Sequence, residues 1–151
     1  MFVLPVMLLI MASLSALSQK YKTGADTIKL NKEWVEVSND IAELTSKLTI
    51  AQNNLPGYHA KSDKAVSDAQ ETAQKSSDQA YKATNADLDD AKSAKKKAKK
   101  ALNDAEDADD AKGDVKGQEK KIEKLTEQLQ KKQKKLRELD EMRTTIRAMH
   151  Q

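Results

Sequence analysis

The chain has 151 residues, of which 38% are hydrophobic and only 3% aromatic, so it lacks the bulky side chains that a compact globular core needs. Its 27 basic residues nearly balance 24 acidic ones, and the net charge of +3 supplies no uniform positive field for holding nucleic acid. The absence of cysteine excludes disulfides, thiolate metal sites, cysteine nucleophiles and the usual bacterial lipoprotein anchor. With 34% charged residues, four Gly and two Pro, the composition predicts an all-α chain of long helices.

Residues 1–18 form an apolar segment without any charged side chain. A helix of this length extends about 26 Å, at the short end of the range for crossing the hydrocarbon layer of a membrane. The small residues near its end fit a signal peptide, whose removal would release a secreted or periplasmic protein. No Lys or Arg precedes the apolar run, which favours an uncleaved anchor instead. We therefore expect a single-pass N-terminal transmembrane anchor, with a cleaved signal as the alternative.

Residues 27–55 show the alternating three-four spacing of apolar residues that is typical of a coiled-coil helix. The apolar seam is narrow, because polar residues separate its members, and it must pack against a partner helix. Residues 56–60 follow with Pro56 and Gly57, which predict a turn or a reversal of the chain. The seam residues that we expect to bind a partner are Leu30, Trp34, Val37, Ile41, Leu44 and Leu48.

Residues 62–112 are rich in Ala, Lys and Asp, which predicts a helix with few large apolar side chains to form a core. An alanine seam buries little area, so this helix should pack weakly or be partly disordered without a partner. Its charges occur in blocks of alternating sign. These blocks support the helix itself through pairs such as Lys100 with Asp104, or serve staggered self-association, or dock an acidic partner on Lys95 to Lys100. The residues that recur every seven positions, with Asp87 as the one interruption, are Val66, Ala73, Ala80, Ala94, Ala101, Ala108 and Val115.

Residues 113–117 contain Gly113 and Gly117, which predict a second break. A basic coiled-coil helix is expected over residues 118–150. Lys132 and Arg143 occupy core slots of its seam, where basic side chains usually extend outward along their stems. The seam residues that we expect to bind a partner are Ile122, Leu125, Leu129, Leu136, Leu139 and Ile146.

These segments predict elongated coiled-coil helices in a three-helix or helical-hairpin arrangement. A hairpin about residues 113–117 brings opposite charges together near the turn but like charges farther away, at a cost under about 1 kcal/mol for each exposed pair. A parallel dimer would stack each charge block on its own copy. A reversal at Pro56 would place both leucine-rich seams in one bundle, so we favour three helices completed by self-association or by another chain.

The chain offers no constellation of catalytic residues, and we expect no enzyme activity, metal or cofactor. His59 and His150 have no second ligand at metal spacing, and no nucleophile motif or phosphate-binding loop occurs. The acidic run at residues 104–110 lacks the Gly and Glu of a calcium loop. The lysine clusters lack interleaved aromatic residues, which argues against nucleic acid as a partner.

An apolar N-terminal segment followed by Ala/Lys/Asp-rich helix and heptads resembles, in architecture alone, the stalk of the Tol-system envelope protein, the inner-membrane spanins of phages and small coiled-coil division proteins. The likeness implies that an anchor sets location and that seams choose partners. We expect a membrane-anchored structural or scaffolding subunit that binds itself or another coiled-coil or membrane protein. The alternatives are a partly disordered stress-protective protein, secreted or periplasmic, and a spanin-like phage lysis protein.

Overall fold

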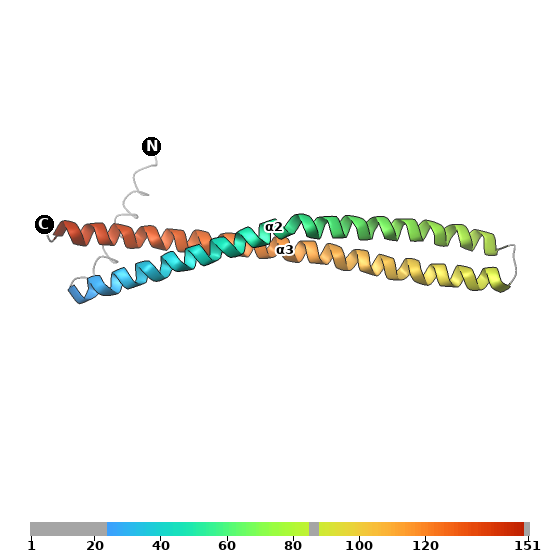
Figure 1. The fold of residues 1–151 in the computed structure, drawn as a ribbon, viewed down its shortest axis with the longest axis horizontal. Coiled ribbons are helices and arrows are strands. Elements are labelled where there is room, and N and C mark those ends of the chain that lie inside the picture. Colours follow the sequence, from blue (N-terminus) through green and yellow to red (C-terminus); the bar gives the residue numbers. More distant parts are fainter. Residues whose placement is uncertain (1–23, 85–87, 150–151) are drawn as a thin grey trace, which may run out of the picture. The chain divides into compact units, whose positions relative to one another are not determined.

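The computed structural model describes residues 24–84 and 88–149 and shows an all-α chain, as the composition predicts. Two helices account for nearly all of these residues: α2 spans Gly24–Ala83 and α3 spans Leu88–Met149 (Figure 1). The predicted apolar helix at residues 1–18 lies outside the described residues, as does His150. Within the described part of the chain, no helix combines the length and the apolar character needed to cross a membrane.

The turn predicted at residues 56–60 is wrong, because Pro56 lies inside α2 and the helix continues through it. A proline in a helix removes one backbone hydrogen bond, here to the carbonyl of Gln52, and costs about 3 kcal/mol. Pro56 and Gln52 are both exposed, so solvent can satisfy that carbonyl. The seam position before Pro56 is Leu55 and the next one is Tyr58, so the three-four spacing passes through the proline without a skip.

The break predicted at residues 113–117 is also wrong, since Gly113 and Gly117 lie inside α3. No glycine of the described residues has a positive φ, so these glycines adopt ordinary helical conformations. Each costs about 1 kcal/mol relative to alanine. The buried side chains of Ala111, Val115 and Gln118 keep their seam positions around the glycines and offset this cost.

The change of direction falls instead between Ala83 and Leu88, inside the helix predicted at residues 62–112. The helices predicted at residues 27–55 and 118–150 are therefore parts of α2 and α3, and the predicted three-helix arrangement is not found in the described part of the chain. Both α2 and α3 pass through two structural units, which we describe separately. Unit 1 contains the described residues up to Lys47 and from Leu125 onward, and unit 2 is Leu48–Lys124.

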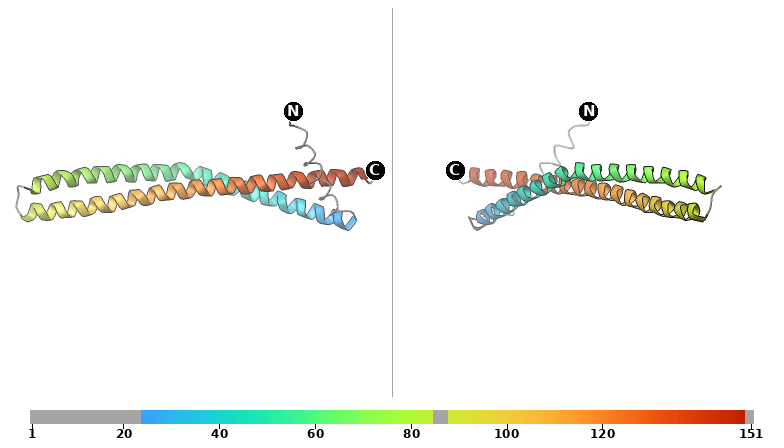
Figure 2. Two further views of the ribbon diagram at one scale, coloured as in Figure 1. Left: turned by 180° about the vertical axis from the view of Figure 1, so that it is seen from behind. Right: turned by 45° about the vertical axis from the view of Figure 1, so that its right-hand side comes forward.

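In unit 1, the two helices run antiparallel and side by side (Figures 1 and 2). Leu30, Val37 and Leu139 form a buried cluster, and Leu30 and Leu139 are the largest side chains that are almost completely buried. Partly buried apolar residues surround this cluster. They are Trp34, Ile41, Leu136, Met142 and Ile146.

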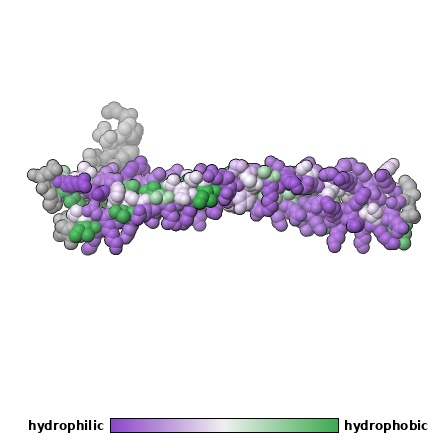
Figure 3. Space-filling view, in the orientation of Figure 1, coloured by the Kyte–Doolittle hydropathy of each residue, from purple (hydrophilic) through white to green (hydrophobic). Residues whose placement is uncertain are grey.

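In unit 2, α2 and α3 again run antiparallel, but the buried residues are small or polar. On the face seen in Figure 3, this unit is mostly hydrophilic. The predicted alanine seam is correct in α3, where Ala108 and Val115 are buried, and wrong in α2, where Ala73 and Ala80 are exposed. The three-four spacing of the leucine-rich seam continues without a shift past Pro56. The residues of α2 that face α3 in unit 2 therefore differ from the predicted alanine seam. These are Ser62, Ala65, Ala69, Thr72, Ser76 and Gln79.

Candidate functional site

The two seams predicted to bind a partner are in part bound to each other. In unit 1, Leu30, Val37 and Leu139 are buried in one cluster that joins α2 to α3. Leu125 is also buried, in the same unit. The remaining seam residues are half-buried. They are Trp34, Ile41, Leu44, Leu48, Ile122, Leu129, Leu136 and Ile146.

Trp34 forms the most specific contact of unit 1. Its Nε1–H donates a hydrogen bond of 2.7 Å to Asp140 Oδ1 on α3. The Arg143 guanidinium lies 4.6 Å from the centroid of the Trp34 ring and 3.6 Å from Asp140 Oδ1. A cation over an indole face is worth about 0.5–1 kcal/mol at an exposed site, so this arrangement explains why an arginine is tolerated at a core slot. Trp34 serves helix pairing.

One flank of unit 1 carries complementary charges on the two helices. Lys135 Nζ lies 2.5 Å from Glu33 Oε1, and Lys132 Nζ lies 2.6 Å from Asp40 Oδ2. Lys132 occupies a seam position but extends to the edge, as the sequence predicts for a basic residue there. Exposed pairs of this kind contribute about 0–1 kcal/mol each, and their main effect is to fix which residues of α2 and α3 face one another.

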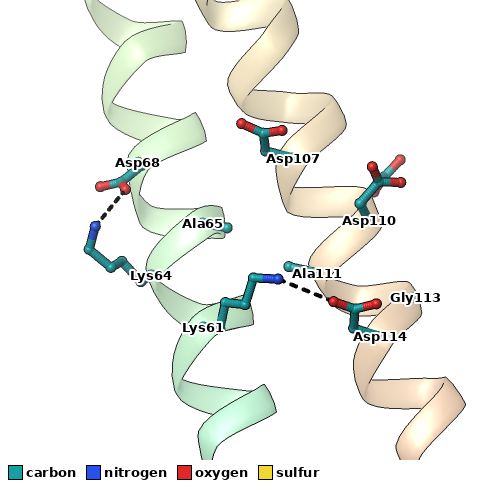
Figure 4. Close-up of a pocket in the computed structure, with 10 residues that line it drawn as sticks. Lys61, Lys64, Ala65, Asp68, Asp107, Asp110, Ala111, Gly113 and Asp114 are labelled. Atoms are coloured by element: carbon teal, nitrogen blue, oxygen red, sulfur yellow. Dashed lines mark hydrogen bonds and ion pairs between the residues drawn. The ribbon is translucent and has the colours of Figure 1, made fainter.

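A shallow groove in unit 2 collects charged side chains from both helices (Figure 4). Lys61 extends from α2 toward Asp114 on α3, with Nζ and Oδ2 3.2 Å apart, while Ala65 and Ala111 lie between the two helices. Further carboxylates line the groove on α3, among them Asp107. The groove contains no histidine or hydroxyl that could act as a nucleophile with these groups. Its arrangement serves charge pairing across the helices.

Asp104 lies at a seam position of unit 2, where a carboxylate is unusual. The Lys100 Nζ lies 2.8 Å from Asp104 Oδ2, and this hydrogen bond is the main cause that lowers the pKa of Asp104. The Thr72 hydroxyl of α2 lowers the pKa of Asp104 further. The same Asp104 carboxylate raises the pKa of Lys100. Both groups therefore favour their charged forms in the folded chain.

Gln118 is a buried polar residue that links the two helices in unit 2. Its Nε2 donates a hydrogen bond of 2.6 Å to the backbone carbonyl of Ala51, whose side chain is 1% exposed. The small Ala51 leaves room for the longer glutamine. A buried polar side chain that finds one partner disfavours other pairings of the seam, because a shift along the helix would leave the amide unsatisfied.

A second stripe runs along α2 in unit 1, beside the seam. None of its residues is charged, and Ile28 and Val35 are 73% and 50% exposed. The hydroxyls of Ser38 and Thr45 donate hydrogen bonds to the carbonyls of Trp34 and Ile41 in the preceding turn. We call this feature the α2 stripe. Its residues are Ile28, Asn31, Val35, Ser38, Ala42 and Thr45.

A comparable face lies on unit 2. His59 of α2 and Glu119 of α3 approach to 4.0 Å across the helices, and residues at multiples of seven from them share this side. We call this feature the alanine face. Leu88 and Leu102, at 71% and 59% exposure, border it on α3. Its residues are Val66, Ala73, Ala80, Ala91, Ala98 and Ala105, and Lys112 lies on the same side between Ala105 and Glu119.

The α2 stripe and the alanine face were not among the predicted binding residues. The seven-residue recurrence of Val66, Ala73 and Ala80 is visible in the sequence, but it was assigned to the seam between helices. The structure places Ala73 and Ala80 on the outside.

Residues 24–84 and 88–149 contain no group of three or more His, Asp or Glu side chains arranged to hold a metal ion. No protein-family model, curated protein or solved structure gives a match to this chain.

Proposed function

We propose that this protein is a structural coiled-coil subunit that assembles with other chains at a membrane. The main support for this proposal is the α2 stripe, the uncharged surface that lies beside the seam of α2 in unit 1. A chain that worked alone would gain by placing charged residues there, because exposed apolar side chains invite association. Instead, Ile28 and Val35 of the α2 stripe are 73% and 50% exposed.

The charge distribution supports the same proposal. On α2 of unit 1, charged residues such as Glu33 and Asp40 lie on the flank that pairs with α3. The other flank, the α2 stripe, is uncharged from Ile28 to Thr45. A helix with one charged flank and one uncharged flank beside its seam has an uncharged surface that another helix can cover.

The membrane part of the proposal rests on the uncharged segment at residues 1–18. An anchor of this kind concentrates copies in a plane and raises the effective concentration for contacts between their helices. Weak alanine-lined surfaces then suffice for assembly.

Site-specific photocrosslinking in native membranes tests the proposal. A photoreactive residue at Val35 should form adducts with a second protein chain, either a copy of this chain or another helical protein. The matched control is the same residue at Glu43, eight positions later on the charged side of the helix, which should form few adducts. Adducts at neither site, or equal adducts at both sites, would contradict assembly through the α2 stripe.

Circular dichroism of the full chain distinguishes the stress-protective alternative. Assembly through preformed helices requires strong helical signal in the isolated chain, whereas a solvating protein of this composition would be largely unfolded.

A further inference from the structure

The outer surface of α3 in unit 2 carries two charge blocks of opposite sign, with Leu102 between them. The basic block contains Lys92, Lys95, Lys96 and Lys99, and the acidic block contains Glu106, Asp109 and Asp110. Among the described residues, none of Lys95, Lys96 and Lys99 has an ion-pair partner. Glu106 and Asp110 likewise have none in that part of the chain.

The two blocks are arranged nearly symmetrically about Leu102. Lys95 precedes Leu102 by seven residues and Asp109 follows it by seven, so all three lie on one face of the helix. The alanines Ala98 and Ala105 lie on the same side, one turn before and one turn after Leu102. A surface with this arrangement is complementary to itself when a second copy is turned by a two-fold axis near Leu102.

We propose that the alanine face and the outer surface of α3 in unit 2 bind a second copy of this chain, with the two α3 helices antiparallel. This inference rests on the proposed assembly function and names the partner and the surface. In this arrangement, residues whose numbers sum to about 203 face one another. The basic block of each copy then meets the acidic block of the other, with contacts such as Lys99 to Glu106 and Lys95 to Asp109. Leu102 packs near the axis against Ala98 of the second copy.

The side chains on this surface favour close packing of helices. Exposed alanines at Ala91, Ala98 and Ala105 let a neighbouring helix approach closely, although each buries little apolar area. Leu88 and Leu102 supply the larger apolar contacts. A parallel pair would set Lys95 to Lys99 against the same lysines of the second copy, so charge selects the antiparallel pair.

Charge reversal with mixing tests the proposal on the purified full chain. In the first variant, Lys95, Lys96 and Lys99 are changed to Glu. In the second, Glu106, Asp109 and Asp110 are changed to Lys. The dimer dissociation constant of each variant alone, measured by sedimentation equilibrium, should be at least about tenfold higher than that of the wild type. An equimolar mixture should form the heterodimer at least as well as the wild type forms its dimer, because every facing pair is then of opposite sign.

The mixture also controls for misfolding, because variants that fail to fold cannot restore association. A matched variant with the same charge change outside the surface, Lys120, Lys121 and Lys124 to Glu, should dimerise like the wild type. Unaffected association in both reversed variants, or a mixture that stays monomeric, would overturn the antiparallel interface. Neither result would remove the proposed assembly function, which the photocrosslinks at Val35 test independently.

Cysteine crosslinking gives the orientation, since the wild-type chain has no cysteine. Lys99→Cys and Glu106→Cys chains should form disulfides with each other when mixed, and much less with themselves. Dominant disulfides within pure Lys99→Cys would indicate a parallel pair and overturn the proposal. Asp107→Cys, which points into the groove of Figure 4, is the matched control and should remain reduced.

Discussion

Three glycines inside the helices give a sharp test of the fold, because their substitution by alanine has opposite signs in a helix and in a turn. Gly57, Gly113 and Gly117 are helical and have no positive φ. A Cβ added at each would meet nothing within 4 Å. Alanine at each position should therefore stabilise the chain by about 0.5–1 kcal/mol, and by about 2 kcal/mol for all three.

Thermal unfolding of the full chain, followed by the helical circular dichroism signal, measures this effect. A gain of about 2 kcal/mol corresponds to a rise in Tm of about 4–8 °C for a chain of this size. The matched control is Ala60→Gly, an exposed position of α2 near Gly57, which should lower the stability by about 1 kcal/mol. A lower Tm for the triple alanine variant would refute the continuous helices and favour turns at these glycines.

Three further substitutions probe the packing and the charges. Leu139→Ala empties the core of unit 1, where Leu139 is 2% exposed, and should cost about 2–5 kcal/mol in a urea titration. Gln118→Ala removes the hydrogen bond to Ala51 and should cost about 1 kcal/mol; no loss would mean that the bond does not stabilise the pairing. The pKa of Asp104 is lowered in the folded chain, so the ionised carboxylate stabilises the fold at pH values above its pKa in the unfolded chain. This stabilisation is lost as the pH falls through the pKa of Asp104 in the folded chain. Asp104→Asn should therefore unfold with less dependence on pH below about pH 4 than the wild type, and an unchanged acid profile would contradict the pairing with Lys100.

The helical class and the seam of residues 27–55 follow from the sequence, because three-four spacing of large apolar residues leaves few alternatives. Leu30, Val37 and Leu139 lie on the predicted seams and are buried. Local propensity alone predicts reversals at Pro56 and the glycines, which lie inside the helices. Their cost of about 1–3 kcal/mol each is spread over long helices whose packing offsets it.

The true change of direction leaves two signals in the sequence. Asn85 and Asp87 belong to residue types that favour turns and helix starts, and they stand directly before Leu88. A reversal there also pairs opposite charges, such as Glu33 with Lys135 in unit 1. A hairpin about residues 113–117 brings like charges together at its ends, whereas a reversal about Asn85 brings opposite charges together, as observed in unit 1.

The outward position of Ala73 and Ala80 was harder to foresee. An alanine recurring every seven residues fits an inner seam and an outer face equally well, because its side chain is too small for burial to decide between them. The inner and outer positions can be distinguished only by continuing the spacing of the leucine-rich seam past Pro56. That continuation applies only if the helix does not break at Pro56.

Crosslinking of isotope-mixed copies in native membranes tests most directly the claim that this chain works by assembly. Native membranes from one culture grown in natural nitrogen and one grown in heavy nitrogen are fused before crosslinking, so a link between two chains is recognised by its mixed mass. Mixed links should join Lys95, Lys96 or Lys99 of one copy to residues after Leu102 of the other. Links confined to single copies, together with no links to any other protein, would contradict it.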